Sequence, residues 1–189
     1  MSDSPAHVVA LVGSLRQASI NRRLVDAVAG AVGPDVVITV AASLDRLPFY
    51  NEDIDPDVNP AAAPLDENVV ALRELVGGAD AVLVATPEYN GSTPAVLKNA
   101  IDWLSRPYGT GAIKDKPAGV ISAALGRFAG TWSREDTRKS LGIAGAQVVE
   151  EVDLGLPTAD IGDGELPAEA VAAGVGAVGV LVAGATARV

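Results

Sequence analysis

The chain has 189 residues, a formal net charge of −10, no cysteine and one histidine. The lack of cysteine excludes disulfides, thiolate nucleophiles and the usual structural zinc sites, and the single imidazole of His7 excludes sites built from several histidines. The acidic balance disfavours nucleic acid as a partner, because contacts to phosphate backbones need clusters of Lys and Arg.

The first part of the chain predicts two strands and two helices. The apolar run at residues 8–12 is typical of a strand buried on both faces, as in a parallel sheet. Apolar residues spaced three or four apart predict a helix over residues 21–31, and a second strand follows at residues 36–40. A long loop with four prolines, residues 42–64, leads to a helix over residues 65–76. A loop of that length is often functional.

The middle of the chain predicts a third strand at residues 81–85 and a helix after it. Thr93 can cap this helix, and Pro94 fits its first position. One face of the helix then holds four apolar residues: Leu97, Ala100, Ile101 and Leu104. A fourth strand is predicted at residues 117–124 and a fourth helix over residues 134–142.

The last part of the chain predicts a fifth strand at residues 147–152, a turn-rich stretch at residues 155–167 and a final helix over residues 170–187. The final helix has no charged residue, and its length approaches that of a membrane span. It is mostly Ala, Gly and Val, and because Ala and Gly contribute little transfer free energy, we expect it to pack against the protein, with no membrane partner. This helix also contains a GxGxxG string: Gly174, Gly176 and Gly179. Because no strand–helix–strand unit follows, we interpret these glycines as sites of close helix packing.

The alternation of five strands with helices predicts an α/β fold: a single domain, residues 1–189, with a doubly wound, five-stranded parallel sheet and helices on both faces. In such sheets ligands bind beyond the carboxyl ends of the strands, where the strand order switches. We therefore expect the chemistry in the loops after strands one, three and four, at residues 13–21, 86–93 and 122–132.

The loop after the first strand has the features of an anion site. It opens onto a helix N-terminus, where unpaired N–H groups and the positive end of the dipole favour an anion. Its polar side chains are Ser14, Arg16, Ser19 and Asn21. It lacks the Lys-Ser/Thr of a Walker loop, so a monophosphate suits it better than a triphosphate. The alternative is that Ser19 only caps the helix and that Arg16 is solvated.

The loop after the third strand, residues 86–94, is suited to a flat ring. Its prolines and Gly91 shape a turn whose exposed backbone N–H and C=O groups can pair with the polar edge of a heterocycle. Tyr89 offers an aromatic face. The alternative interpretation of Tyr89 is an ordinary half-buried anchor of the loop.

Several stretches together resemble the NADPH-dependent FMN reductase family. They are Gly13-Ser14-Leu15-Arg16 with Ser19 and Asn21-Arg22, Leu47 to Asp53, Pro87 to Ser92, and Leu97 to Trp103. The resemblance spans roughly residues 7–145, with the motifs in the expected order and on the expected loops. It implies a flavodoxin-like fold with strand order 2-1-3-4-5.

The resemblance also implies the residues of a cofactor site. The first loop would hold the FMN phosphate with Ser14, Arg16, Ser19 and Asn21. The second loop would line the isoalloxazine ring with Pro87, Glu88, Tyr89, Asn90 and Gly91. The loop after the fourth strand would close the site with Ser122 and Gly126. Within residues 123–130 the chain departs from the family, which has a glycine-rich stretch with paired glycines there.

The activity that this resemblance implies is that of an NAD(P)H-dependent oxidoreductase. Hydride would pass from NADPH or NADH to FMN N5 and then to a quinone, flavin or similar small acceptor in a ping-pong cycle. No metal and no catalytic side chain is required, because the cofactor carries the chemistry. The family implies a homodimer or homotetramer, and the absence of a signal-peptide pattern indicates a cytoplasmic protein. Two alternatives remain open: a flavodoxin-like electron carrier, and a flavin-free regulatory or scaffolding member.

Overall fold

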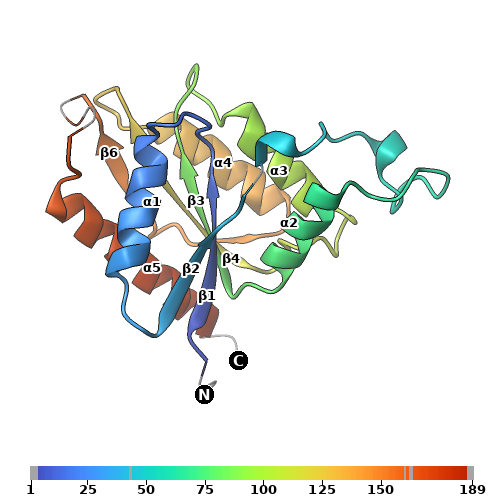
Figure 1. Ribbon diagram of the computed structural model, residues 1–189, viewed down its shortest axis with the longest axis horizontal. Coiled ribbons are helices and arrows are strands. Elements are labelled where there is room, and N and C mark those ends of the chain that lie inside the picture. Colours follow the sequence, from blue (N-terminus) through green and yellow to red (C-terminus); the bar gives the residue numbers. More distant parts are fainter. Residues whose placement is uncertain (1–3, 43, 160, 162–163, 187–189) are drawn as a thin grey trace.

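The computed structural model describes residues 4–42, 44–159, 161 and 164–186. A parallel sheet lies at its centre, and helices cover both faces of the sheet (Figure 1). The strands are β1 (Ala6–Val12), β2 (Val36–Val40), β3 (Ala81–Thr86), β4 (Pro117–Ala124), β5 (Gln147–Val148) and β6 (Gly155–Pro157). The helices are α1 (Ile20–Ala31), α2 (Glu67–Gly77), α3 (Ala95–Leu104), α4 (Thr131–Ile143) and α5 (Ala168–Thr186), with short 3-10 helices at Leu44–Arg46 and Glu52–Ile54.

The strand order is β2-β1-β3-β4-β5 with all pairs parallel, which confirms the flavodoxin-like sheet. The chain moves outward from β1 to β2 and then crosses back to β3. The carboxyl ends of β1 and β3 therefore flank the switch point in strand order, at the upper edge of the sheet in Figure 1. This is the edge at which ligands bind in sheets of this kind.

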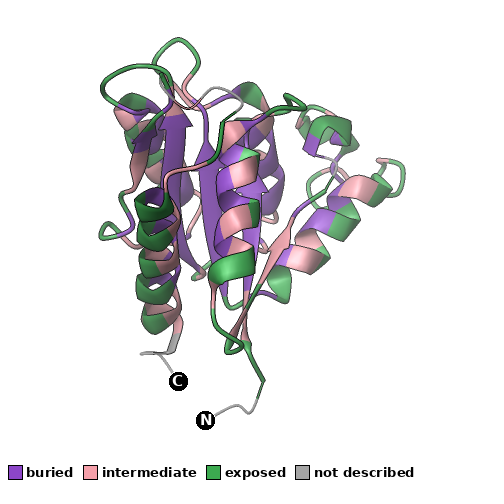
Figure 2. Ribbon diagram, turned by 60° about the vertical axis from the view of Figure 1, so that its left-hand side comes forward, coloured by how far each residue is buried: buried purple, intermediate pink, exposed green. Residues whose placement is uncertain are grey.

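Alternate residues of the strands face two separate cores. On one face of the sheet, Val9 and Leu11 of β1 pack with side chains from α2, α3 and α4. On the other face, Val8, Ala10 and Val12 pack with side chains from α1 and α5. Figure 2 shows the central strands β1, β3 and β4 buried between helices whose outer faces are exposed. Burial on both faces explains why β1 and β3 consist of continuous apolar runs.

The fifth strand is shorter than the predicted range of residues 147–152. Strand β5 covers only its first two residues, and the short strand β6 pairs with the end of β4. Between them the chain turns, and Val152 packs over Gly119 of β4, where an added Cβ would lie 2.6 Å from Val152 Cγ1. Pairing resumes where the N–H of Ser122 donates to the carbonyl of Leu154 at 2.8 Å. The predicted turn-rich stretch therefore contains a strand.

Helices α1, α2 and α5 begin within two residues of the predicted start, whereas the start of α4 and the cap of α3 differ from the prediction. Helix α4 begins earlier than residue 134, directly after Gly130, whose φ of 79° is in the left-handed region. Pro94 occupies the N-cap position of α3, and Thr93 does not cap this helix. The Thr93 hydroxyl instead lies 2.8 Å from the hydroxyl of Thr137 in α4. A tertiary contact thus uses the side chain that local capping rules assign to the helix.

The long loop between β2 and α2 is tied to α3. The side-chain amide of Asn99 donates to the carbonyl of Pro48 at 3.0 Å and accepts from the N–H of Tyr50 at 2.8 Å. Trp103 is fully buried, donates from Nε1 to the carbonyl of Pro48 at 2.7 Å and meets the ring of Tyr50 edge-on. Two of the stretches that carry the family resemblance therefore contact each other and have a structural role.

Helix α5 packs against the second core with one face exposed (Figure 2). Gly174 allows the close approach of α1, because an added Cβ would lie 2.4 Å from Val28 Cγ2. No atom lies within 4 Å of a Cβ added at Gly176 or Gly179. Close packing is therefore confirmed for Gly174, but not for the other two glycines.

The composition of α5 also matches that of a membrane span. Residues 168–185 have a mean hydropathy of 1.8, and 28% of this window is buried. By length and composition it is the one helix in the described part of the chain that could cross a membrane. Its side chains at Ala170, Val178 and Leu181 are nevertheless buried in the second core. Position 187, the predicted end of this helix, lies outside the described residues.

Candidate functional site

A cavity of about 340 Å³ opens at the carboxyl ends of β1, β3 and β4. This volume lies within the range of small-molecule pockets. The cavity brings together predicted residues from two loops: Ser14, Arg16, Ser19, Asn21, Pro87, Glu88 and Tyr89. The remaining wall comes from the end of β4 and from the residues after β6. The expected edge of the sheet is therefore the place where the predicted loops meet.

The first loop (residues 13–21) presents polar groups to this cavity. The side chains of Ser14 and Arg16 form no hydrogen bond or ion pair with any other residue that the structure describes. Ser19 is buried and caps α1, since its Oγ accepts from the N–H of Arg22 at 3.2 Å. The N–H groups at the start of α1 have no acceptor within the helix. Hydroxyl, guanidinium and backbone donors thus gather at one end of the cavity, as an anion site requires.

Asn21 is part of the cavity wall, and its side chain is engaged there. Its Nδ2 donates to the carbonyl of Ala123 at 2.8 Å, and its Oδ1 accepts from the N–H of the same residue at 2.9 Å. This reciprocal pair joins the first turn of α1 to the end of β4. The amide therefore bridges two walls of the cavity, which is a different role from the phosphate contact that the resemblance implies.

The second loop (residues 86–93) contains a tight turn. Tyr89 and Ser92 pair as an isolated antiparallel bridge, with N–H to carbonyl contacts at 3.4 and 3.1 Å. Asn90 and Gly91 between them have φ of 53° and 70°. Positive φ at both central positions is the geometry of a type I′ turn, for which Asn-Gly is the preferred pair. Neither of these two residues lines the cavity, so they shape the loop whose earlier residues form the wall.

The third loop (residues 122–132) meets the cavity only at its start. The lining residues there are Ala123, Ala124 and Leu125. Neither Ser122 nor Gly126 lines the cavity, in contrast to the expectation from the resemblance. Ser122 is fully buried, and its Oγ donates to the carbonyl of Ala129 and accepts from Arg134 Nη1 at 2.7 Å. Its side chain is turned toward the third loop and α4, away from the cavity.

The third loop contains two consecutive residues in a backbone conformation that favours glycine, although only one of them is a glycine. Ala129 has φ of 48° and Gly130 has φ of 79°, so both residues are in the left-handed region. This conformation is free for glycine and costs a residue with a Cβ about 1 kcal/mol. With alanine at position 129 in place of a glycine, the same loop conformation therefore costs more free energy than it does with the family's paired glycines.

Arg134 of α4 forms hydrogen bonds to the third loop. Its side chain is 8% exposed, and its Nη1 donates to Ser122 Oγ and to the carbonyl of Ala129, both at 2.7 Å. Its Nε pairs with the carboxylate of Asp153 at 2.6 Å. Burial disfavours the ionised form of that carboxyl group and by itself raises its pKa. The hydrogen bonds from Arg138 and Arg134 have the larger combined effect, so the pKa of Asp153 lies below its ordinary value. Asp153 is thus ionised at neutral pH and balances a buried guanidinium.

The wall formed by Thr158 and Ala159 was not predicted from the sequence. These residues follow β6 directly, and the N–H of Thr158 donates to the carbonyl of Ala124 at 3.0 Å. They reach the cavity because β6 runs beside the end of β4. Strand β6 has only three residues, so it is too short to produce a recognisable periodicity.

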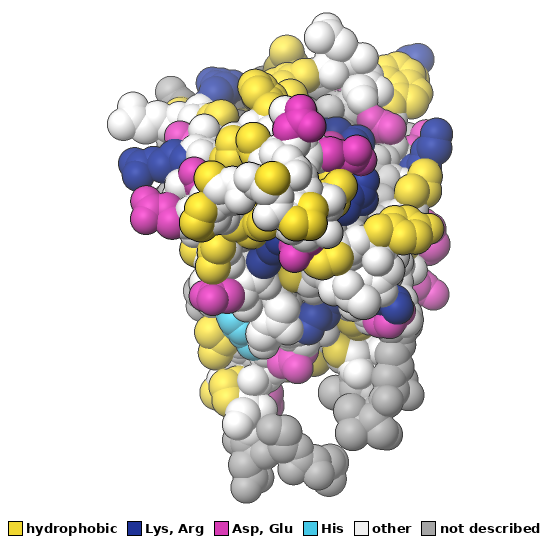
Figure 3. Space-filling model, turned by 90° about the vertical axis from the view of Figure 1, so that its right-hand side faces the viewer, with side chains coloured by type: hydrophobic (Ala, Val, Ile, Leu, Met, Phe, Trp, Pro, Cys, Tyr) yellow, Lys and Arg dark blue, Asp and Glu magenta, His cyan; other side chains and the backbone are white. Residues whose placement is uncertain are grey.

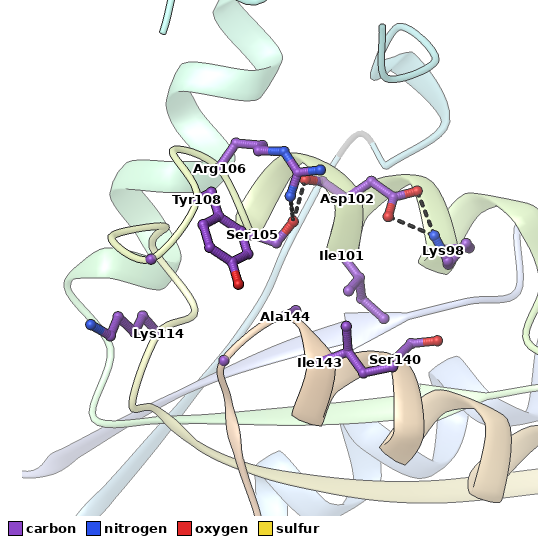
Figure 4. Close-up of a pocket in the computed structure, with 12 residues that line it drawn as sticks. Lys98, Ile101, Asp102, Ser105, Arg106, Tyr108, Lys114, Ser140, Ile143 and Ala144 are labelled. Carbon is purple, nitrogen blue, oxygen red and sulfur yellow. Dashed lines mark hydrogen bonds and ion pairs between the residues drawn. The ribbon is translucent and has the colours of Figure 1, made fainter. Parts of the chain in front are cut away.

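A second cavity, of about 420 Å³, lies between α3, α4 and the loop at residues 105–114 (Figure 4). Two of its charged groups, Lys98 and Asp102, pair with each other at 2.6 Å, and Arg106 donates to Ser105 Oγ at 3.0 Å. The 105–114 loop leads to the amino end of β4, which is opposite the ligand-binding edge of the sheet. We therefore assign the candidate site to the first cavity.

Charges of both signs are mixed on the surface. On the face seen in Figure 3, Lys and Arg side chains lie among Asp and Glu side chains. The described part of this face shows no extended basic stripe of the kind that a nucleic acid backbone requires.

The chain is similar to known flavin-dependent enzymes. Residues 6–160 match the family described as NADPH-dependent FMN reductase. A quinone reductase of Pseudomonas putida is 40% identical over 134 residues, which cover 71% of this chain and 68% of that enzyme. An NAD(P)H-dependent FMN reductase of Pseudomonas aeruginosa is 40% identical over 141 residues, with 75% and 71% covered. Among solved structures, the flavoenzyme NAD(P)H:(acceptor) oxidoreductase FerB from Paracoccus denitrificans has a TM-score of 0.82 and 28% identity, with 97% of this chain and 98% of that chain covered.

Proposed function

The chain belongs to the NADPH-dependent FMN reductase family, and on this premise we propose that it is an NAD(P)H-dependent FMN oxidoreductase that forms a single FMN-binding domain. Bound FMN would supply the redox chemistry, which is the transfer of hydride from NADPH or NADH to a quinone, flavin or similar small acceptor in a ping-pong cycle. The observation that carries the proposal is the cavity in which the polar first loop and the Pro87–Tyr89 stretch of the second loop meet at the switch point of the sheet.

The first loop fits the phosphate of FMN. Ser14 and Arg16 line the cavity and have no partner among the described residues, so both can donate to a phosphate oxygen. The O–H of Ser19 and the unpaired N–H groups of α1 add donors at a positive helix end. A guanidinium next to a helix N-terminus gives charge-assisted hydrogen bonds, which are about twice as strong as neutral ones.

The second loop fits the ring of FMN. Pro87 has no N–H and is buried, and Glu88 and Tyr89 continue the wall from the carboxyl end of β3. The tight turn that follows holds this stretch in one conformation. Ala123, Ala124 and Leu125 add apolar side chains to the wall of the cavity. In this proposal the chain binds, orients and shields the ring.

The absorbance of the purified protein tests this function. We expect FMN uptake with visible flavin bands, and bleaching of those bands by NADPH or NADH under anaerobic conditions. Bleaching by a reductase partner, but not by a nicotinamide nucleotide, would favour the alternative of an electron carrier. No uptake of FMN at excess ligand would contradict both flavin-dependent functions and favour the flavin-free alternative.

We also propose that the protein is a homodimer or homotetramer with α3 near its interface. Two large side chains beside the cavity of Figure 4 support this: Tyr108 is 89% exposed and Ile143 is 75% exposed. Exposed apolar groups that gather around a groove are typical of protein contacts.

Ile143→Glu tests this assembly by placing a charge in the contact. We expect sedimentation velocity to show a species of smaller mass for this variant than for the wild type. Val58→Glu is the control, because Val58 is an exposed apolar residue of the long loop between β2 and α2, outside the groove. A monomeric wild type, or an Ile143→Glu variant of unchanged mass, would refute the proposed interface.

A further inference from the structure

A set of hydrogen bonds joins the second loop to α4, and neither the sequence motifs nor the proposed cofactor contacts account for it. We name this set the α4 seam. On the loop it comprises Thr86, Pro87, Glu88, Ser92 and Thr93. On the helix it comprises Ser133, Asp136 and Thr137. The seam lies behind the part of the loop that lines the cavity.

Ser133 holds the beginning of the loop. Its side chain is fully buried, and its Oγ lies 2.6 Å from Thr86 Oγ1 and 2.8 Å from the carbonyl of Pro87. Its N–H donates to the carboxylate of Glu88 at 3.2 Å. This last bond also satisfies one of the unpaired N–H groups at the start of α4. One residue of α4 thus contacts three successive residues of the loop.

Asp136 holds the end of the loop. A single carboxylate oxygen, Oδ2, accepts from the hydroxyl of Ser92 and from the N–H of Thr93, the latter at 3.1 Å. At the next residue of α4, the hydroxyls of Thr93 and Thr137 lie 2.8 Å apart. The hydrogen bonds from Ser92 and Thr93 lower the pKa of Asp136, so the carboxylate is ionised at neutral pH.

The bonds of Asp136 serve the loop rather than the helix. A side chain that caps a helix acts on the N–H groups of the first turn, whereas Asp136 lies beyond the first turn of α4, which begins at Thr131. Its acceptor oxygen is used by groups of the second loop. Ser133 and Asp136 therefore hold the loop on both sides of the Tyr89–Ser92 turn, next to the Pro87–Tyr89 stretch that lines the cavity.

We propose that Asp136, together with Ser133, is a positioning residue for the flavin reaction: it places the Pro87–Tyr89 backbone against the polar edge of the ring and so tunes ring affinity and reduction. This inference rests on the proposed function. Loss of the hydrogen bonds to Asp136 would let the loop shift. A displacement of about 1 Å at a reacting centre can lower a rate about a hundredfold. The phosphate end of the cavity lies on a different loop, so its contribution to binding stays unchanged.

The test compares Asp136→Ala with Asp136→Asn, whose carboxamide oxygen can still accept both bonds. We expect Asp136→Ala to weaken binding of FMN and of riboflavin, which lacks the phosphate, by the same factor of about ten or more. We also expect a shifted reduction potential of bound FMN and a lower rate of reduction at saturating NADPH. In the flavin-free protein, amide hydrogen exchange at Thr93 should become faster. Asp136→Asn should restore most of each property.

Glu135→Ala is the matched control, since it removes a neighbouring exposed acid of the same helix. If Asp136→Ala proves too unstable to purify, Ser92→Ala removes only one bond of the carboxylate and should give a smaller change of the same kind. Unchanged affinity, potential and reduction rate in Asp136→Ala would overturn the positioning role, as would an Asp136→Asn variant that is no better than Asp136→Ala. A wild-type protein that takes up no flavin would instead overturn the proposed function itself.

Discussion

Replacing Ser14 and Arg16 together with alanine is expected to weaken FMN binding about a hundredfold while leaving riboflavin binding unchanged. Two charge-assisted hydrogen bonds to a phosphate contribute about 3 kcal/mol together, which corresponds to about two orders of magnitude in Kd. Neither side chain has a partner among the described residues, so the free energy of unfolding of the flavin-free protein should not change. Fluorescence titration with the two flavins measures the effect.

Arg22→Ala is the control for this double variant. It removes a guanidinium from the first turn of α1 that is half-exposed and already paired with Asp26 at 2.8 Å. A surface pair of this kind contributes little, so the ratio of the two flavin affinities should stay at the wild-type value. If the Ser14 and Arg16 replacements leave that ratio unchanged as well, the phosphate does not bind at the first loop.

Asn21→Leu is expected to lower the free energy of unfolding by about 3 kcal/mol. Leucine has a similar size, but it leaves the N–H and carbonyl of Ala123 without their partners in a buried position. The cavity wall between α1 and β4 loosens, so the affinities for FMN and riboflavin should fall by the same factor. Urea denaturation of the flavin-free protein and titration with the two flavins measure these effects.

Gln17→Leu provides the comparison for Asn21→Leu, because it removes an exposed amide from the same loop. Its stability should stay close to that of the wild type. A selective loss of FMN affinity in Asn21→Leu, with riboflavin affinity and stability intact, would show that Asn21 is a phosphate ligand after all. The experiment thus separates the role implied by the family from the bridge that the structure contains.

The sequence identifies the lining side chains that lie within short loops after buried strands. Ser14, Arg16 and Ser19 follow β1 directly, and Pro87 to Tyr89 follow β3, so their place at the carboxyl edge comes from the parallel sheet alone. Asn90 and Gly91 belong to the same motif but lie outside the cavity. Their residue types suit a type I′ turn as well as a ligand-binding loop, and the sequence cannot distinguish the two uses.

An apolar run in the sequence predicts that a strand exists more reliably than it predicts how long the strand is. Residues 147–152 look like a strand, yet the chain leaves the sheet because Val152 packs over a glycine of β4. Pairing then resumes in the three residues of β6, which carry Thr158 to the cavity. Both outcomes depend on the surface of a strand that lies about thirty residues earlier in the chain, so no local pattern predicts them.

The sequence by itself determined the α/β class, the strand order through its motifs and the edge of the sheet at which the site lies. The class and the edge follow from apolar periodicity and from the position of loops along the chain, which are local properties. The strand order follows from the resemblance of the motifs to a known family. Only the tertiary structure decided which polar side chains of the site can meet a ligand and which are held by other segments of the protein. Asn21 bridges α1 and β4, Ser122 turns to Arg134, and Asp136 grips the second loop, because each finds a backbone or side-chain partner in a segment far away in sequence. A buried polar group must be satisfied, and the partner that satisfies it exists only once the fold has formed.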